Sequence, residues 1–83
     1  MSTKIYVGNL SYNVRDEELR DQFSRYGDVA SAKVMSDRDT GRSKGFGFVE
    51  MNDSTQAQAA ISALDGVTVD GRALKVNEAR PRV

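Results

Sequence analysis

Residues 44–51, Lys44-Gly45-Phe46-Gly47-Phe48-Val49-Glu50-Met51, alternate between charged or aromatic side chains and small or apolar ones. A period of two is typical of a β-strand, and it predicts a strand over residues 45–51. One face of this strand holds Gly47, Val49 and Met51. The opposite face holds Phe46, Phe48 and Glu50. The first face suits a hydrophobic core, so the two phenyl rings on the second face need another explanation.

Three other strands are predicted from the same alternation. Residues 4–10 open as a strand with Ile5 and Val7 on the core side and Tyr6 and Gly8 on the opposite side, and Gly8-Asn9 is expected to break it. Residues 29–36 and about 72–79 follow the same pattern. Their core-side residues are Ala32, Val34, Leu74 and Val76, and their outward residues are Lys33, Met35, Lys75 and Asn77. A short extra strand at 67–69 is expected before a hairpin turn at Asp70-Gly71.

Two helices are predicted between the strands. Leu19, Phe23 and Tyr26 recur at i, i+4 and i+7, which gives residues 14–26 one apolar stripe, and Gly27 is expected to end this helix. Asp53 begins the second helix, with Gln56 as its capping-box partner. The buried stripe of this helix is Ala57, Ala60, Ile61 and Leu64, and Asp65-Gly66 ends it.

The element order β-α-β-β-α-β predicts an α+β fold, the ferredoxin-like βαββαβ sandwich, whose four-stranded antiparallel sheet carries both helices on one face. The other face stays open, and there the alternation places Tyr6, Phe46 and Phe48. Three aromatic side chains on an uncovered sheet face indicate a ligand. Nucleobases fit such a surface because every base has a π face. We expect Lys44 and Arg42, at its edge, to hold phosphates, and Gly45 and Gly47 to leave space beside the backbone.

The composition limits the classes of function. The chain has 83 residues, enough for one domain (1–83) with one modest core. It has neither Cys nor His, which excludes disulfides, thiolate metal sites and the usual general base. We therefore expect no enzyme, no cofactor and no metal. The acidic cluster Asp16, Glu17, Glu18 and Asp21 is most simply a helix-start charge pattern. No apolar run approaches the roughly 18–20 residues of a membrane span.

Charge is balanced overall but uneven along the chain. There are 12 Lys and Arg against 12 Asp and Glu, which argues against a strong non-specific polyanion binder. Residues 33–48 hold four cations and two anions, and residues 72–83 hold four cations and one anion. Phosphate attraction is therefore expected to be local, with stacking supplying a large share of any affinity.

Two motifs carry a resemblance to a known family. Residues 44–51 resemble the octamer motif of the RNA-recognition motif family, and Ile5-Tyr6-Val7-Gly8-Asn9-Leu10 resembles its companion hexamer. The resemblance covers about residues 3–80 and leaves 81–83 as a short tail. It implies RNA contact by Tyr6, Phe46 and Phe48, and a phosphate contact by Lys44. It also implies base contacts from the last strand and the residue after it, namely Lys75, Asn77, Ala79 and Arg80, and a turn-supporting role for Asn9.

Some residues depart from the family pattern or stay ambiguous. Met51 stands where the octamer ends in Phe or Tyr, which should alter packing rather than RNA contact. Arg15 stands where many members have a helix-capping Thr or Ser, which leaves the start of the first helix open. For Arg38 and Arg42, plain solvation and RNA contact both stay open. Lys33 and Met35 are further candidate contacts on the open face.

The first functional hypothesis is binding of single-stranded RNA, in post-transcriptional regulation. Single-stranded DNA binding and a protein-interaction module on the same fold are the alternatives, and a monomer is expected. The bare end at Val83 resembles small single-domain RNA-binding proteins of bacteria, and the domains of glycine-rich and cold-inducible RNA-binding proteins are also similar. The first residues show no signal-peptide pattern. We expect a cytoplasmic location, nuclear or organellar if the protein is eukaryotic, and no membrane association.

Overall fold

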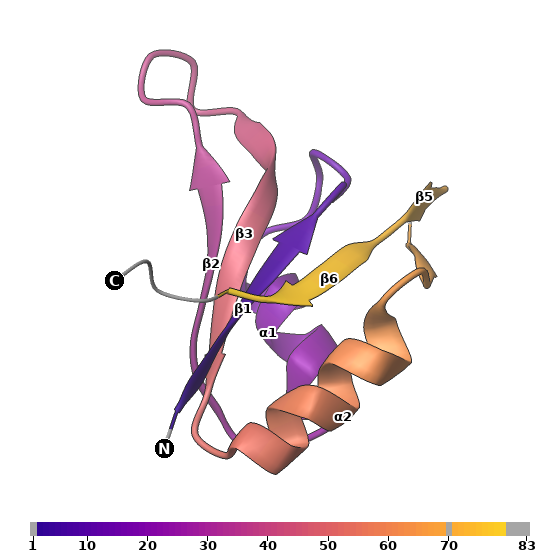
Figure 1. The fold of residues 1–83 in the computed structure, drawn as a ribbon. Helices are drawn as coiled ribbons and strands as arrows, with labels where there is room; N and C mark the ends of the chain where they lie inside the picture. The colour runs from indigo at the N-terminus through magenta and orange to yellow at the C-terminus, as the bar shows by residue number, and fades with distance from the viewer. Residues whose placement is uncertain (1, 70, 80–83) are drawn as a thin grey trace.

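Strands and helices alternate in the order expected from the sequence (Figure 1). The computed structural model describes residues 2–69 and 71–79. Its elements are β1 (Thr3–Gly8), α1 (Asp16–Ser24), β2 (Val29–Ser36), β3 (Ser43–Met51), α2 (Ser54–Leu64), β4 (Thr68–Val69), β5 (Arg72–Ala73) and β6 (Lys75–Glu78). Four of the strands form one antiparallel sheet in the order β2-β3-β1-β6, and β4 with β5 forms a separate hairpin. The predicted βαββαβ sandwich is confirmed.

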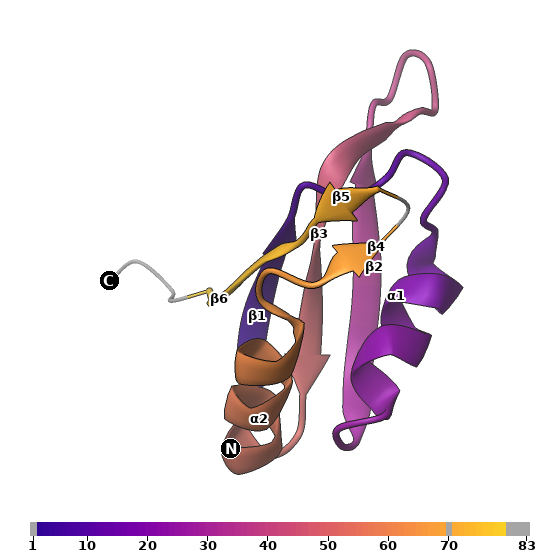
Figure 2. The same cartoon turned by 90° about the vertical axis from the view of Figure 1, so that its right-hand side faces the viewer.

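Both helices cover the same face of the sheet (Figure 2), where α1 packs on β2 and α2 packs on β1 and β6. Beneath them lies the core, which contains the inward residues of every strand of the four-stranded sheet. Ile5, Val7, Val49 and Met51 are fully buried, and Leu74 and Val76 are nearly so. The burial of Met51 agrees with its expected role in packing. Ala32 and Val34 are partly buried against the same core.

The second helix begins where its cap was predicted, but the capping box is only half formed. Asp53 is the N-cap residue, and its Oδ1 accepts a hydrogen bond of 3.0 Å from the Gln56 amide. The Gln56 side chain does not return to Asp53. Its Oε1 accepts from the Asp28 amide at 3.1 Å instead, and so ties the first turn of α2 to the residue before β2.

The first helix is shorter than the predicted 14–26. Arg15, with φ −113° and ψ 176°, is extended and precedes the first helical residue, Asp16. The Val14 amide belongs to a turn, donating to the Ser11 carbonyl at 3.0 Å. At the other end Arg25, not Gly27, is the C-cap residue. The apolar stripe extends beyond the helix, because Tyr26 still packs on the core from the residues that follow α1.

The last strand, predicted as one piece over 72–79, is divided at Leu74. The Leu74 amide donates to the Val67 carbonyl at 2.9 Å, and the Gly66 amide donates to the Leu74 carbonyl at 2.8 Å. These bonds pull residues 72–73 toward β4 as a hairpin, while Lys75–Glu78 pairs with β1. The first strand, in contrast, ends at Gly8, which confirms the predicted break at Gly8-Asn9, and Asn9 takes a left-handed conformation with φ +58°.

Candidate nucleic-acid interface

The open sheet face carries three clustered rings, Tyr6, Phe46 and Phe48, which we call the aromatic platform. The register of β1 and β3 places Tyr6 opposite Phe48, and Gly8 opposite Phe46. Ring centroids are 5.8 Å apart for Tyr6 and Phe48, 6.1 Å for Tyr6 and Phe46, and 6.2 Å for Phe46 and Phe48. Each residue is partly exposed, so the rings support one another and still present area to a ligand.

Gly8 determines how the Tyr6 ring lies. A Cβ atom on Gly8 would stand 2.7 Å from the Tyr6 hydroxyl oxygen and 2.9 Å from Cε2. The ring therefore lies along its own strand, above the backbone of Gly8, where a larger residue would collide with it. This orientation carries Tyr6 toward Phe46, with which it makes a stacked pair at an interplanar angle of 30°.

Gly47 has a different role from the one expected. The sequence predicted that it leaves space beside the backbone, but it is buried on the helix side of β3. A Cβ atom there would lie 2.5 Å from the Lys33 carbonyl oxygen and 3.1 Å from Leu19 Cδ2. Gly47 thus permits the close approach of β2 and α1 and leaves no room for a ligand, so that part of the interpretation is wrong.

The outward residues of the neighbouring strands surround the platform as the alternation predicted. Lys33 is opposite Phe48, Asn77 is opposite Tyr6, and Lys75 is opposite Gly8. Lys33, Lys75 and Asn77 are exposed, whereas Met35 and Ala79 are partly exposed. The Ala79 amide donates to the Lys4 carbonyl at 2.8 Å, which holds the end of the chain's last strand beside β1. Arg80 and the tail 81–83 lie outside the described residues.

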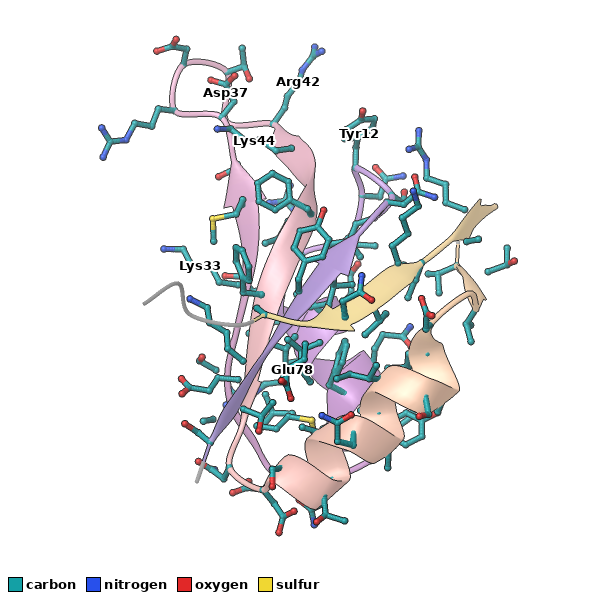
Figure 3. The ribbon with its side chains drawn as sticks, viewed as in Figure 1. Tyr12, Lys33, Asp37, Arg42, Lys44 and Glu78 are labelled. Carbon is teal, nitrogen blue, oxygen red and sulfur yellow. The ribbon has the colours of Figure 1, made fainter. Side chains whose placement is uncertain are left out.

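The β2–β3 loop projects beyond the sheet at the end where the platform lies (Figure 3) and carries Arg38 and Arg42, and Lys44 follows it on β3; all three residues are exposed. Backbone bonds close the loop: the Asp37 amide donates to the Arg42 carbonyl at 2.7 Å, and the Gly41 amide to the Asp37 carbonyl at 2.8 Å. Lys44 precedes Phe46 by two residues on β3. The structure therefore brings Lys44 to the edge of the platform, whereas Arg38 and Arg42 stand farther along the loop.

Asn9 supports the turn after β1, as its motif position implied. Its left-handed backbone redirects the chain, and its side chain Nδ2 donates to the Ala73 carbonyl at 2.7 Å. The Leu10 amide then donates to the Gly45 carbonyl at 2.8 Å. These bonds fix the β1–α1 loop against the ends of β3 and β5.

Lys4, Tyr12 and Arg72 were not identified from the sequence as candidate site residues. Lys4 has the same strand parity as Tyr6, and its ammonium lies 4.8 Å from the centroid of the Phe48 ring. Tyr12 is 62% exposed, with the Arg72 guanidinium carbon 5.1 Å from its ring centroid. Parity was a sufficient signal for Lys4. An aromatic residue between Ser11 and Asn13, outside every apolar stripe, was the available signal for Tyr12.

The residues around the platform carry a small net positive charge. Lys4, Lys33 and Lys75 share its face with one carboxylate, Glu50, which stands opposite Lys4 in the register. Glu50 Oε2 accepts a hydrogen bond of 2.7 Å from Ser2 Oγ. Within residues 2–69 and 71–79, no group of carboxylates is arranged to hold a metal ion, and no helix is long and apolar enough to cross a membrane.

Fold and platform together define a class of protein domain, an α+β sandwich with one helix-covered face and one open face bearing aromatic rings. The sequence profile described as RNA recognition motif matches residues 5–75, and the chain belongs to this family.

Individual relatives agree with this assignment. The protein RbpE of Nostoc is 58% identical over 78 residues, which cover 94% of this chain and 79% of that protein. The mitochondrial glycine-rich RNA-binding protein 2 of Arabidopsis thaliana is 54% identical over 82 residues, 99% of this chain. This chain spans about half of the Arabidopsis protein, 52% of its length. Among solved structures, that of the RNA-binding protein PG1 superposes with a TM-score of 0.92 at 52% identity and covers 98% of both chains.

Proposed function

We propose that residues 1–83 act as one RNA-recognition domain that binds single-stranded RNA by stacking bases on Tyr6, Phe46 and Phe48. The observation that carries this proposal is the clustering of three partly exposed rings, with centroids 5.8–6.2 Å apart, on the sheet face that the helices leave open. Domains of this kind stack two or three bases on such rings. A role in post-transcriptional regulation of RNA follows from binding of this type.

Stacking and charge have separate tasks in this proposal. Each stacked base contributes about 1–3 kcal/mol, whatever its identity. Lys44 and Lys75 attract phosphates at the two sides of the platform, and Asn77 offers its amide to a base edge. Arg42, Arg80, Lys33, Met35, Arg38 and Ala79 are the further candidate contacts. Because the overall charge is zero, the logarithm of the binding constant should fall only shallowly with that of salt, by about 0.7 per phosphate contacted.

The test is the double variant Phe46→Leu, Phe48→Leu. Leucine keeps an apolar side chain at both positions and removes the π faces. We expect the affinity for a uridine hexamer to fall at least about 30-fold, from two lost stacks, with a circular dichroism spectrum like that of the unsubstituted protein. Val67→Ala is a matched control, because Val67 is an exposed apolar residue, 38% exposed, outside the platform. An unchanged affinity in the folded double variant would refute platform stacking.

Single-stranded DNA is the second candidate ligand, because a π face does not distinguish ribose from deoxyribose. We propose a preference for RNA, supported by membership of the RNA recognition motif family. Titration with a uridine hexamer and a deoxyuridine hexamer under the same conditions tests it. Equal affinities would show that no 2′-hydroxyl contact is made.

Three broader features complete the proposal. We infer a binding protein rather than an enzyme, and turnover in nuclease or phosphatase assays would contradict this. We also infer a monomer, for which sedimentation equilibrium should return one chain of 9.1 kDa. The named relatives come from a bacterium and from a plant mitochondrion, and we propose the cytoplasm of a bacterial cell as the location. Fractionation with an antibody tests the location.

A further inference from the structure

Tyr12 is the most exposed large aromatic side chain in the described part of the chain, at 62% of its surface. Its exposure does not come from a loose loop. The Val14 amide donates to the Ser11 carbonyl at 3.0 Å, and the Asn13 amide donates to Ser11 Oγ at 3.4 Å. Ser11 itself is buried, with 9% exposed. The loop therefore holds the Tyr12 ring in solvent, at the cost of leaving apolar surface uncovered.

The ring lies beside the start of β3. A Cβ atom on Gly45, the residue before Phe46, would lie 3.7 Å from Tyr12 Cε1. Gly45 has φ +81°, and its carbonyl accepts from the Leu10 amide at 2.8 Å, so this edge of the platform and the β1–α1 loop are fixed together. Figure 3 shows Tyr12 at the same end of the sheet as Arg42 and Lys44.

Arg72 covers one face of the Tyr12 ring. Its guanidinium carbon lies 5.1 Å from the ring centroid, within the range of a cation–π contact. Nη1 donates to Asn9 Oδ1 at 3.4 Å, and Asn9 in turn bonds the Ala73 carbonyl. The guanidinium is thus anchored from the β4–β5 hairpin. With 62% of the residue exposed, a second face remains open to a planar ligand.

We propose that Tyr12, backed by Arg72, is a fourth base-stacking site, which takes the nucleotide next to those on the aromatic platform. The inference rests on the proposed function and extends its footprint past the end of β3. A base would stack on the open face of Tyr12, while Arg72 and Lys44 lie at either side for its phosphate. A ring that only shielded the Gly45 backbone would not need to remain mostly in solvent.

Oligomer length separates this site from the platform. A uridine trimer can fill the three platform rings, whereas a hexamer reaches Tyr12. Tyr12→Ala should weaken hexamer binding about tenfold and trimer binding less than about twofold. Tyr12→Phe should retain hexamer affinity, because it keeps the ring. Equal hexamer affinity for Tyr12→Ala and the unsubstituted protein would overturn the inference, and so would an equal loss for trimer and hexamer, which would make Tyr12 a support of the platform.

A direct reporter is available because the chain contains no Trp. In Tyr12→Trp the single indole should be quenched when the hexamer binds, and should change little with the trimer. Quenching by neither oligomer, although both bind, would overturn the site while leaving the platform intact. The Phe46→Leu, Phe48→Leu variant should lose both oligomers. If the unsubstituted protein binds neither, the proposed function and this inference fail together. If Tyr12 instead binds a protein partner, Tyr12→Ala should leave the affinity for both oligomers unchanged.

Discussion

The ammonium of Lys4 lies 4.8 Å from the centroid of the Phe48 ring, on a surface that a stacked base could occupy. A cation–π contact at an exposed site contributes about 0.5–1 kcal/mol. A stacked base contributes about 1–3 kcal/mol, so a base should displace the ammonium. The displaced Lys4 stays next to the platform, where it can meet the phosphate of the base that replaced it.

Lys4→Gln should therefore make RNA binding less sensitive to salt. One lost phosphate contact should reduce the slope of log K against log salt by about 0.7, with the largest loss of affinity at low salt. The measurement is a series of hexamer titrations at increasing sodium chloride. Lys4→Arg is the control and should keep the slope. Identical slopes for Lys4→Gln and the unsubstituted protein would show that the ammonium meets no phosphate.

Glu50→Gln should strengthen RNA binding. Glu50 is the carboxylate opposite Lys4 on the platform face, and its Oε2 accepts from Ser2 Oγ at 2.7 Å. Glutamine can still accept that bond but no longer repels phosphate. Exposed charge interactions contribute about 0.2–1 kcal/mol, so affinity should rise by a factor of about 1.4 to 5 at low salt. Near 1 M salt the Debye length falls to about 3 Å, so the gain in affinity should vanish. No gain at low salt would place the RNA away from this part of β3.

Gly47→Ala should destabilise the fold. Its methyl group would lie 2.5 Å from the Lys33 carbonyl oxygen, which is backbone and cannot rotate away. Overpacking of this kind costs about 1–3 kcal/mol, or a Tm decrease of about 5–15 °C for a domain of this size. Gly41→Asn is the control, because no atom lies within 4 Å of a Cβ there and asparagine tolerates φ +73°. Comparable Tm values for the two variants would contradict the assignment of Gly47 to strand packing.

Asp16→Ala should weaken the packing of α1 against β2. Asp16 Oδ1 accepts a bond of 2.7 Å from the Val34 amide on β2, the edge strand of the sheet, and its charge lies in the first turn of the helix. Loss of both effects should lower the free energy of unfolding by about 1–2 kcal/mol.

The specific readout for this variant is hydrogen exchange at the Val34 amide, which should become about tenfold faster. Glu17→Ala is the control. It also removes a carboxylate from the first turn of α1, but it keeps the bond between Asp16 and the Val34 amide, which should stay protected. Faster exchange in both variants would mean that the helix charge, and not the bond, protects Val34.

Strand parity alone predicted which residues face the core and which face the open side, because a period of two is a local property. It placed Tyr6, Phe46 and Phe48 together, and parity applied to Lys4 would have added that residue. The N-cap of α2 at Asp53 was likewise predicted from a local sequence pattern. RNA contact by any of these residues stays a prediction.

Long-range bonds account for what the sequence did not predict. Leu74 interrupts the last strand because it bonds Val67, and Gln56 leaves its capping box because it bonds Asp28. Tyr12 lies between Gly45 and Arg72 because Asn9 turns the chain and because Arg72 arrives from a hairpin, 60 residues further along the chain. Each of these depends on a partner that no local pattern identifies.

Asn9 allows the turn and the long-range bond to be tested separately. Asn9→Ala loses the bond of 2.7 Å to the Ala73 carbonyl and also places alanine at φ +58°. Asn9→Gly loses the same bond but accepts that φ without strain. The bond contributes about 1 kcal/mol and the left-handed conformation costs alanine about 1–2 kcal/mol. We therefore expect thermal unfolding to show Asn9→Ala as the less stable variant by at least about 4 °C.

Both Asn9 variants release the anchor of Arg72, so both should weaken binding of the uridine hexamer more than that of the trimer. This effect should be similar for alanine and glycine, because it depends on the lost side chain and not on the backbone. If Asn9→Gly were the less stable variant, the left-handed turn would not be the source of strain. If neither variant altered hexamer binding, the Arg72 guanidinium would not need Asn9 to stay on the Tyr12 ring.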